Sequence, residues 1–321
     1  MITNKKIKLL INIINIFFYH ERNINDYQKN INLIKKIFDL VESNKNSIED
    51  IQYLYKLPIY FLKTAAITEY SEFFVNETRC LWYNSFNPLS KNIIVYFHGG
   101  GYCLGTPEIY LKFMNRLDEN INKQYTNILL FDYKKSPDFQ YPFAINESFN
   151  LYKYLLRFFS NNNFIFIGDS AGANLLIQTC NKIIEENLKQ PKALICLSPW
   201  IISNIKGKFW NLNKNKDYLN EYCINLAKES YIGNTNTDNY RSILDFNYNL
   251  FPPIYIRAGG NELILDEIYA LAEKIKSNRQ YNFKFEIINN MCHAFDLIYS
   301  FDIDNSPKLN NLIDYINSHL N

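Results

Sequence analysis

One serine stands in a context that could make it a nucleophile. Ser170 is the centre of Gly168-Asp169-Ser170-Ala171-Gly172, which fits the pattern G-x-S-x-G. Residues 164–167 before it have the composition of a strand, and residues 173–188 after it have the composition of a helix. In such an elbow the strand turns sharply into the helix with the serine at the tip, and small residues give the strained turn room. We therefore predict a nucleophilic Ser170, with a plain strand-to-helix turn as the alternative.

A serine hydroxyl is a weak nucleophile until a base takes its proton, and the chain offers four histidines. His20 lies in the N-terminal segment, His319 is near the end of the chain, and His98 lies in a glycine-rich turn upstream of the serine. His293 follows the last expected strand. In hydrolases built on this elbow the chain order is serine, acid, histidine, with the histidine after the last strand. Its position in the chain, after the serine and after the last expected strand, predicts His293 as the base.

The acid that orients the imidazole should follow the expected strand 254–258. Glu262 and Asp266 are the contenders there. Glu262 is close to the strand end, whereas Asp266 comes one helical turn later, where acids commonly interact with the helix dipole. We predict Glu262, and Asp266 is the alternative.

Acyl transfer also needs N–H donors for the oxyanion of its tetrahedral intermediate. A glycine run follows the expected strand 92–97 in His98-Gly99-Gly100-Gly101-Tyr102. Gly99 and Gly100, with Ala171 after the nucleophile, are the predicted donors, and His98 is expected to shape the loop. No G-K-[ST] or G-x-G-x-x-G pattern is present, so nucleotide binding is not expected.

The elements around these residues predict an α/β fold. Short apolar runs alternate with helical segments, which indicates a mostly parallel central sheet flanked by helices. The expected strands are residues 92–97, 128–131, 164–167, 193–197, 254–258 and 283–288, with a hairpin at 70–83. The expected helices are residues 22–65, 144–159, 173–188, 219–231, 263–275 and 307–320.

Together these motifs resemble the hormone-sensitive-lipase-like esterases of the α/β-hydrolase fold. The resemblance is carried by the H-G-G-G-Y and G-D-S-A-G segments, and by Asp132-Tyr133-Lys134 with Pro137 and Ser198-Pro199-Trp200. It implies ester hydrolysis through an acyl-enzyme, without a metal or an organic cofactor. Glu262-Leu263-Ile264 departs from the D-P-L that the family usually carries at the acid position.

The resemblance also implies a helical cap over the site. Residues 1–65 would form an N-terminal cap segment, and residues 66–321 the catalytic domain with a cap insertion at 203–245. Aromatic residues of such a cap suit a hydrophobic acyl or alcohol group. Tyr102, Trp200 and Trp210 are candidate pocket walls, and ordinary core aromatics are the alternative.

The net charge and the N-terminal residues limit the binding partners that we expect. The net charge is +2 without an extended basic block, so nucleic acid is not expected as a partner. Residues 1–20 carry a basic start and a short apolar run, which favours an amphipathic helix covering the core or the active site. A weak interfacial membrane helix is the alternative. We expect a cytoplasmic protein, with association to the endoplasmic reticulum membrane as the variant of that expectation. The sequence leaves the oligomeric state open.

The sequence therefore predicts a serine carboxylesterase of lipid metabolism that acts on short or medium acyl esters of a hydrophobic alcohol. A steryl acetate is the narrower hypothesis for the substrate. An arylformamidase, which would hydrolyse an N-formyl amide, is the nearest enzymatic alternative. A hydrolase-fold receptor without turnover is the alternative from another class, and the presence of His293 argues against it.

Overall fold

A computed structural model describes residues 27–52, 69–121, 126–233, 240–278, 282–299 and 309–320 of the protein. Residues 1–20 lie outside these ranges, so the amphipathic or membrane helix expected there stays a prediction. Within the described part of the chain, no helix is long and apolar enough to cross a membrane.

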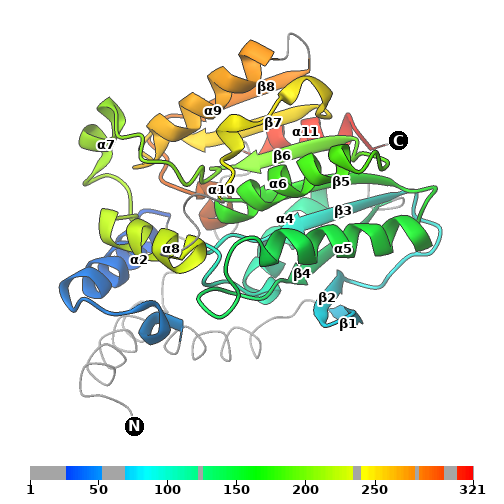
Figure 1. Ribbon diagram of the computed structural model, residues 1–321, viewed down its shortest axis with the longest axis horizontal. Coiled ribbons are helices and arrows are strands. Elements are labelled where there is room, and N and C mark those ends of the chain that lie inside the picture. Colours follow the sequence, from blue (N-terminus) through cyan, green and yellow to red (C-terminus); the bar gives the residue numbers. More distant parts are fainter. Residues whose placement is uncertain are drawn as a thin grey trace.

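Eight strands form one sheet in the order β1-β2-β4-β3-β5-β6-β7-β8 (Figure 1). The pairs β1–β2 and β2–β4 are antiparallel, and all other neighbours are parallel. The predicted α/β fold with a mostly parallel sheet is therefore confirmed. The strands are β1 (Tyr70–Val75), β2 (Thr78–Tyr83), β3 (Asn92–Phe97), β4 (Thr126–Asp132), β5 (Asn163–Asp169), β6 (Ala193–Leu197), β7 (Ile254–Gly259) and β8 (Phe283–Ile288).

Helices cover both faces of this sheet. The α-helices are α2 (Tyr27–Ser43), α4 (Leu111–Asn120), α5 (Phe143–Phe158), α6 (Ala171–Glu185), α7 (Lys208–Asn213), α8 (Glu221–Ile232), α9 (Leu265–Asn278), α10 (Phe295–Tyr299) and α11 (Asn310–Asn317). Short 3-10 helices are η2 (Pro107–Tyr110), η5 (Ile243–Asp245) and η6 (Tyr248–Leu250). Helices α5, α6 and α9 pack on one face, and α4 and α11 pack on the other.

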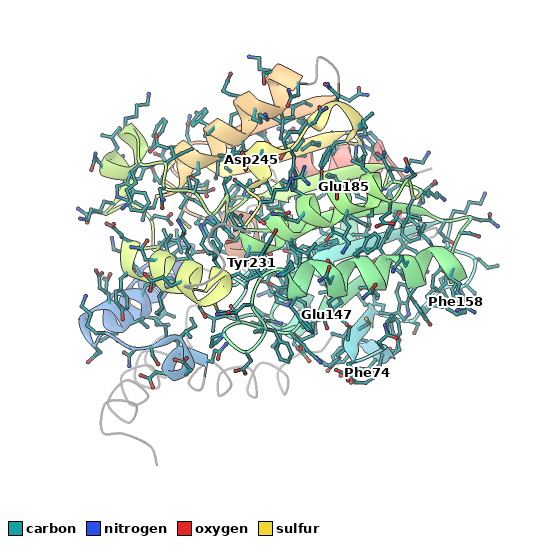
Figure 2. All side chains as sticks on the ribbon, in the orientation of Figure 1. Phe74, Glu147, Phe158, Glu185, Tyr231 and Asp245 are labelled. Carbon is teal, nitrogen blue, oxygen red and sulfur yellow. The ribbon has the colours of Figure 1, made fainter. Side chains whose placement is uncertain are left out.

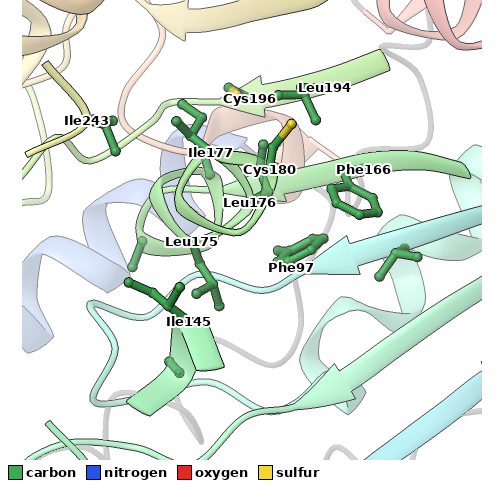
Figure 3. Close-up of a cluster of buried hydrophobic side chains, with 14 of the residues drawn as sticks. Phe97, Ile145, Phe166, Leu175, Leu176, Ile177, Cys180, Leu194, Cys196 and Ile243 are labelled. Carbon is green, nitrogen blue, oxygen red and sulfur yellow. The ribbon is translucent and has the colours of Figure 1, made fainter. Parts of the chain in front are cut away.

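The central strands are buried on both sides because their side chains alternate between two cores. In β3, Val95 and Phe97 face the core under α5, α6 and α9, whereas Ile94 and Tyr96 face the core under α4 and α11. Figure 3 shows the first core, where Leu176 and Cys180 of α6 lie beside strand residues such as Phe166. This packing holds the start of α6, and hence the serine elbow, against the middle of the sheet.

Helix α2 packs against α8, which belongs to the insertion that follows β6 (Figure 1). In this contact the Asn220 side-chain amide donates to the Phe38 carbonyl at 3.2 Å, and the rings of Phe38 and Tyr218 meet edge to face at 5.4 Å. Segments far apart in the sequence therefore form one helical layer, which is the arrangement expected of a cap. The division into cap and catalytic domain stays a prediction.

One predicted helix is interrupted. Helix α2 ends at Ser43, and helical structure within the predicted range 22–65 resumes at residues 48–52. Lys45 takes a left-handed conformation with φ 49°, which an α-helix cannot accommodate, and the amide of Asn46 closes back onto the Val41 carbonyl at 3.2 Å. Residues 53–65 of that prediction lie outside the described residues.

Candidate active site

Ser170 lies at the turn between β5 and α6, as the G-x-S-x-G pattern predicts. Its φ of 52° is a strained value for a residue other than glycine. Two hydrogen bonds to the segment at the end of β6 hold this turn. The Ser170 amide donates to the Leu197 carbonyl at 2.9 Å, and the Trp200 amide donates to the Ser170 carbonyl at 3.0 Å. The end of β6 therefore fixes the position of this serine.

The glycines of the elbow are required by close packing. A Cβ on Gly172 would lie 2.0 Å from the Phe97 carbonyl oxygen, and one on Gly168 would lie 2.8 Å from the same atom. Both distances are far below a normal van der Waals contact. The start of α6 thus presses directly on the end of β3, which brings the serine beside the glycine-rich loop.

Asp169 joins the elbow to that loop. Its carboxylate accepts hydrogen bonds from the Tyr96 hydroxyl and from the Gly99 amide, both at 2.8 Å. Complete burial raises the pKa of Asp169 to about 6, although both hydrogen bonds oppose this rise. The prediction of Gly99 as an oxyanion donor is corrected here, because its N–H points at the Asp169 carboxylate. Asp169 was not among the predicted site residues, although its place inside the G-x-S-x-G motif was a signal.

Gly100, Gly101 and His98 make up the rest of the glycine-rich loop. Gly100 and Gly101 have φ values of 113° and 63°, which favour glycine. His98 stacks on the Tyr133 ring at 4.2 Å and its Nδ1 donates to the Gly99 carbonyl at 2.7 Å. Burial holds the pKa of His98 well below its usual value, so the ring is neutral. These contacts fit a residue that shapes the loop.

His293 and Glu262 form a buried pair. The Nδ1 of His293 lies 2.9 Å from a Glu262 carboxylate oxygen, and both residues are almost inaccessible to solvent. Because the carboxylate accepts, the imidazole carries its proton on Nδ1 and leaves the lone pair of Nε2 available. Burial alone would lower the pKa of His293, but the bond and charge of Glu262, with the charges of Asp217 and Asp169, raise it above the usual value.

Glu262 is anchored on its other oxygen as well. This oxygen accepts hydrogen bonds from the Ser198 hydroxyl at 2.6 Å and from the Gly259 amide. The same Ser198 hydroxyl accepts from the amide of Ala294 at 2.9 Å, next to the histidine. Ser198 thus joins the acid loop to the histidine loop. The segment Ser198-Pro199-Trp200 carried part of the family resemblance, but nothing in its sequence indicated this bridge.

Asp266, the alternative acid, has another set of partners. Its carboxylate accepts from the amides of Gly207, Phe209 and Trp210, at 3.0, 3.3 and 2.8 Å. These amides belong to the N-terminal turn of α7, where no intrahelical acceptor exists. Asp266 therefore caps a helix of the insertion, and Glu262 is the carboxylate that meets His293.

The three candidate pocket residues are buried among other side chains. The hydroxyl of Tyr102 donates to the Asn174 side chain at 2.9 Å, and its ring stacks on Tyr231 of α8 at 3.6 Å. Figure 2 labels Tyr231 where α8 meets the body of the domain. Trp200 belongs to the core under α6, and the Lys206 ammonium lies 4.6 Å from the ring centre of Trp210. Their role as pocket walls stays a prediction.

A metal site was not expected from the sequence. Among the described residues, no group of three or more histidine, cysteine, aspartate or glutamate side chains could hold a metal ion.

Comparison with known proteins places this geometry in a family. The model of a family described as alpha/beta hydrolase fold matches residues 94–297. The chain belongs to this α/β-hydrolase family. The match includes the glycine-rich loop, the serine elbow, Glu262 and His293, so the resemblance drawn from the sequence motifs is confirmed.

Curated relatives of this hydrolase are named as esterases and acetyl-hydrolases. An acetyl-hydrolase of Streptomyces hygroscopicus is 25% identical over 183 residues, which are 56% of this chain and 60% of that protein. An esterase of Acinetobacter venetianus is 24% identical over 237 residues, 71% of this chain and 76% of that protein. Steryl acetyl hydrolase 1 of Saccharomyces cerevisiae is 30% identical over 125 residues, 36% of this chain and 28% of that protein.

Solved structures show the same fold. An esterase from the bacterial hormone-sensitive lipase (HSL) family has a TM-score of 0.74 at 21% identity, covering 86% of this hydrolase and 93% of that chain. The HSL homologue EstE7 from a metagenome library has a TM-score of 0.76 at 20% identity, covering 92% and 99%.

Proposed function

We propose that the protein hydrolyses carboxylic esters through an acyl-enzyme, with Ser170 as nucleophile, His293 as base and Glu262 as the acid that orients it. The observation that carries this proposal is the buried hydrogen bond between His293 Nδ1 and Glu262, on a chain whose one G-x-S-x-G serine lies at a strained elbow. The names of the curated relatives support ester bonds as the substrate class.

The chemistry then follows from the protonation of the imidazole. His293 Nε2 takes the proton of the Ser170 hydroxyl while the oxygen attacks the ester carbonyl. The oxyanion is bound by backbone amides, for which we propose Gly100 and Ala171. Because the Gly99 amide is committed to Asp169, we propose Gly101 as the further donor of this loop. His293 next gives its proton to the leaving alcohol, and a water activated by the same Nε2 releases the acid.

The substrate proposal is an ester of a short or medium acyl chain with a hydrophobic alcohol. Acetyl groups recur in the names of the relatives, and the yeast relative is named for steryl acetate, over a match of 36% of this chain. A steryl acetate is therefore the first hydrophobic substrate to test.

A fluorophosphonate probe and a substrate panel test this function. We expect the probe to label Ser170 in the folded protein and to leave Ser170→Ala unlabelled. We expect turnover of p-nitrophenyl acetate and butyrate to exceed that of octanoate, and sterol acetate is tested alongside. Absence of labelling and turnover in the wild type would favour the receptor reading. Turnover of N-formylkynurenine in preference to every ester would favour the arylformamidase.

A further inference from the structure

A second buried carboxylate lies beside the acid–histidine pair, and it comes from the cap insertion. Asp217 follows α7, and its side chain is 1% exposed. One carboxylate oxygen accepts the amide of His293 at 3.1 Å and the amide of Tyr218 at 2.8 Å. The other accepts the amide of Leu263, the residue after the acid, at 2.7 Å. A single carboxylate thus holds the two loops that carry Glu262 and His293.

Asn213, one helical turn before Asp217, completes this contact. Its side-chain amide donates to the carbonyls of Gly260 and Glu262, at 3.0 and 2.9 Å, and the residue is 1% exposed. Asp217 therefore satisfies amides of the two loops, and Asn213 satisfies carbonyls of the acid loop. Buried polar groups with this number of backbone partners fix the relative position of the segments that they join.

The N-terminal helix covers the same place from outside. Ile31 of α2 packs with Met291, Cys292 and Phe295 around the histidine loop. The ring centres of Tyr218 and His293 are 6.1 Å apart. Asp217 and Asn213, with the backbone groups that they bind, form a clamp that is closed off from solvent. Ionic contacts buried in this way are screened least by salt.

We propose that Asp217 and Asn213 are positioning residues through which the cap insertion assembles the Glu262–His293 pair, and that the Asp217 charge tunes the protonation of His293. This proposal rests on the proposed function. It implies that the catalytic domain alone does not determine the position of His293. If the cap insertion were displaced, the Glu262 loop and the His293 loop would both lose Asp217, their shared partner.

The charges around His293 give the direction of the effect. Glu262 comes from the β7–α9 loop, Asp169 from the elbow and Asp217 from the insertion, and each of them raises the pKa of His293. Tyr218 stays neutral, because burial raises the pKa of its phenol well above 10. The Cys292 thiol donates to the His293 carbonyl. Burial raises the pKa of Asp217 to about 6, against the charge of His293 and the bonds from its amide partners, so Asp217 is ionised above neutral pH.

Asp217→Asn is the decisive variant, because it removes the charge at nearly constant side-chain size, although its single amide oxygen can replace only one of the two accepting carboxylate oxygens. We expect the pKa of His293 to fall by about one unit, as for loss of a nearby opposite charge. Two readouts report it: the acid limb of the kcat/KM profile with p-nitrophenyl acetate, and the NMR titration of the imidazole, assigned with His293→Gln. An unchanged pKa in the folded variant would overturn the tuning role.

The matched control is Asp266→Asn. Asp266 is also a carboxylate that accepts backbone amides of the insertion, but its partners lie at α7 and not at His293. We expect this control to lower thermal stability without moving the His293 pKa. An equal shift in the two variants would show a general effect of loosening the cap and would overturn the proposal.

Asn213→Ala tests the clamp separately from the charge and does not depend on the folding of Asp217→Asn. We expect kcat to fall about tenfold, with KM and the pH midpoint nearly unchanged, because misplacing a base costs rate more than binding. An unchanged kcat would contradict the positioning role. If the wild type itself shows no turnover, the proposed function fails, and the NMR titration still tests the clamp.

Discussion

The nucleophile side and the acid–histidine side of the site are built in different ways. On the nucleophile side, the elbow and the glycine-rich loop are joined by backbone packed at contact distance, and one carboxylate, Asp169, links them. On the other side, Glu262 and His293 are joined by hydrogen bonds that also involve Ser198 and Asp217, residues far away in the sequence. The difference teaches that steric shape positions Ser170, whereas charge and long-range hydrogen bonds position His293.

The largest expected effect separates the two acid candidates. Glu262→Gln should lower kcat/KM by about a thousandfold, about 4 kcal/mol, because the amide cannot hold the imidazolium that forms in the transition state. Asp266→Asn should keep kcat/KM within about tenfold of the wild type. Steady-state kinetics with p-nitrophenyl acetate, at equal concentrations of folded enzyme, measures both. Loss of activity in Asp266→Asn with near-normal Glu262→Gln would reverse the assignment.

The close packing on the nucleophile side is tested by adding one methyl group to a glycine of the elbow. Gly172→Ala should lower the free energy of unfolding by about 3 kcal/mol, because its Cβ would lie 2.0 Å from the Phe97 carbonyl oxygen and the backbone must move. Gly260→Ala is the matched control on the acid side, since its Cβ would find its nearest neighbour at 3.4 Å. Urea unfolding of both variants gives the comparison. Equal stabilities would show that close packing is not what distinguishes the elbow.

The smallest effect concerns a buried carboxylate on the acid side that has no histidine partner. Glu267 accepts the Ser203 hydroxyl at 2.8 Å, and burial raises its pKa from 4.5 to about 7, against the hydrogen bond of Ser203. The folded state therefore favours the protonated form, and the stability that this form contributes is lost as the pH rises from about 4.5 through 7.

Glu267→Gln cannot ionise and should escape this loss. Relative to the variant, the wild type should lose about 2 kcal/mol of unfolding free energy between pH 5 and pH 7. Urea unfolding at several pH values measures the difference. A constant difference across this range would mean that Glu267 does not carry a raised pKa, in contrast to what its burial implies.

The sequence predicted the parts of the site whose signals are local. The strand, serine and helix of the elbow were all identified, because tight turns restrict residue type and short apolar runs mark buried strands. His293 and Glu262 were predicted from chain order, and the structure brings the two together. Their catalytic roles, and those of Ser170, Gly100 and Ala171, stay predictions that the kinetics above would test.

Other features could not be read from local patterns. Gly99 was predicted as an oxyanion donor because it sits in a glycine run, but the direction of its N–H depends on Asp169, which is 70 residues away. The helix expected over residues 22–65 is interrupted after Ser43, because periodicity does not reveal the left-handed turn at Lys45. The partners of Ser198 and Asp217 are equally invisible, since a serine or an aspartate carries no mark of the loop that it will meet.

The amino-acid sequence by itself determined the α/β architecture, the strained elbow at Ser170 and the order of the candidate triad, because these depend on periodicity, small residues and position along the chain. Only the tertiary structure decided which carboxylate meets His293, which glycine amide is already occupied, and that Asp217 binds the loops of both Glu262 and His293 while Asn213 binds the Glu262 loop. Those outcomes depend on distances between segments separated by 31 to 76 residues, which folding alone brings together.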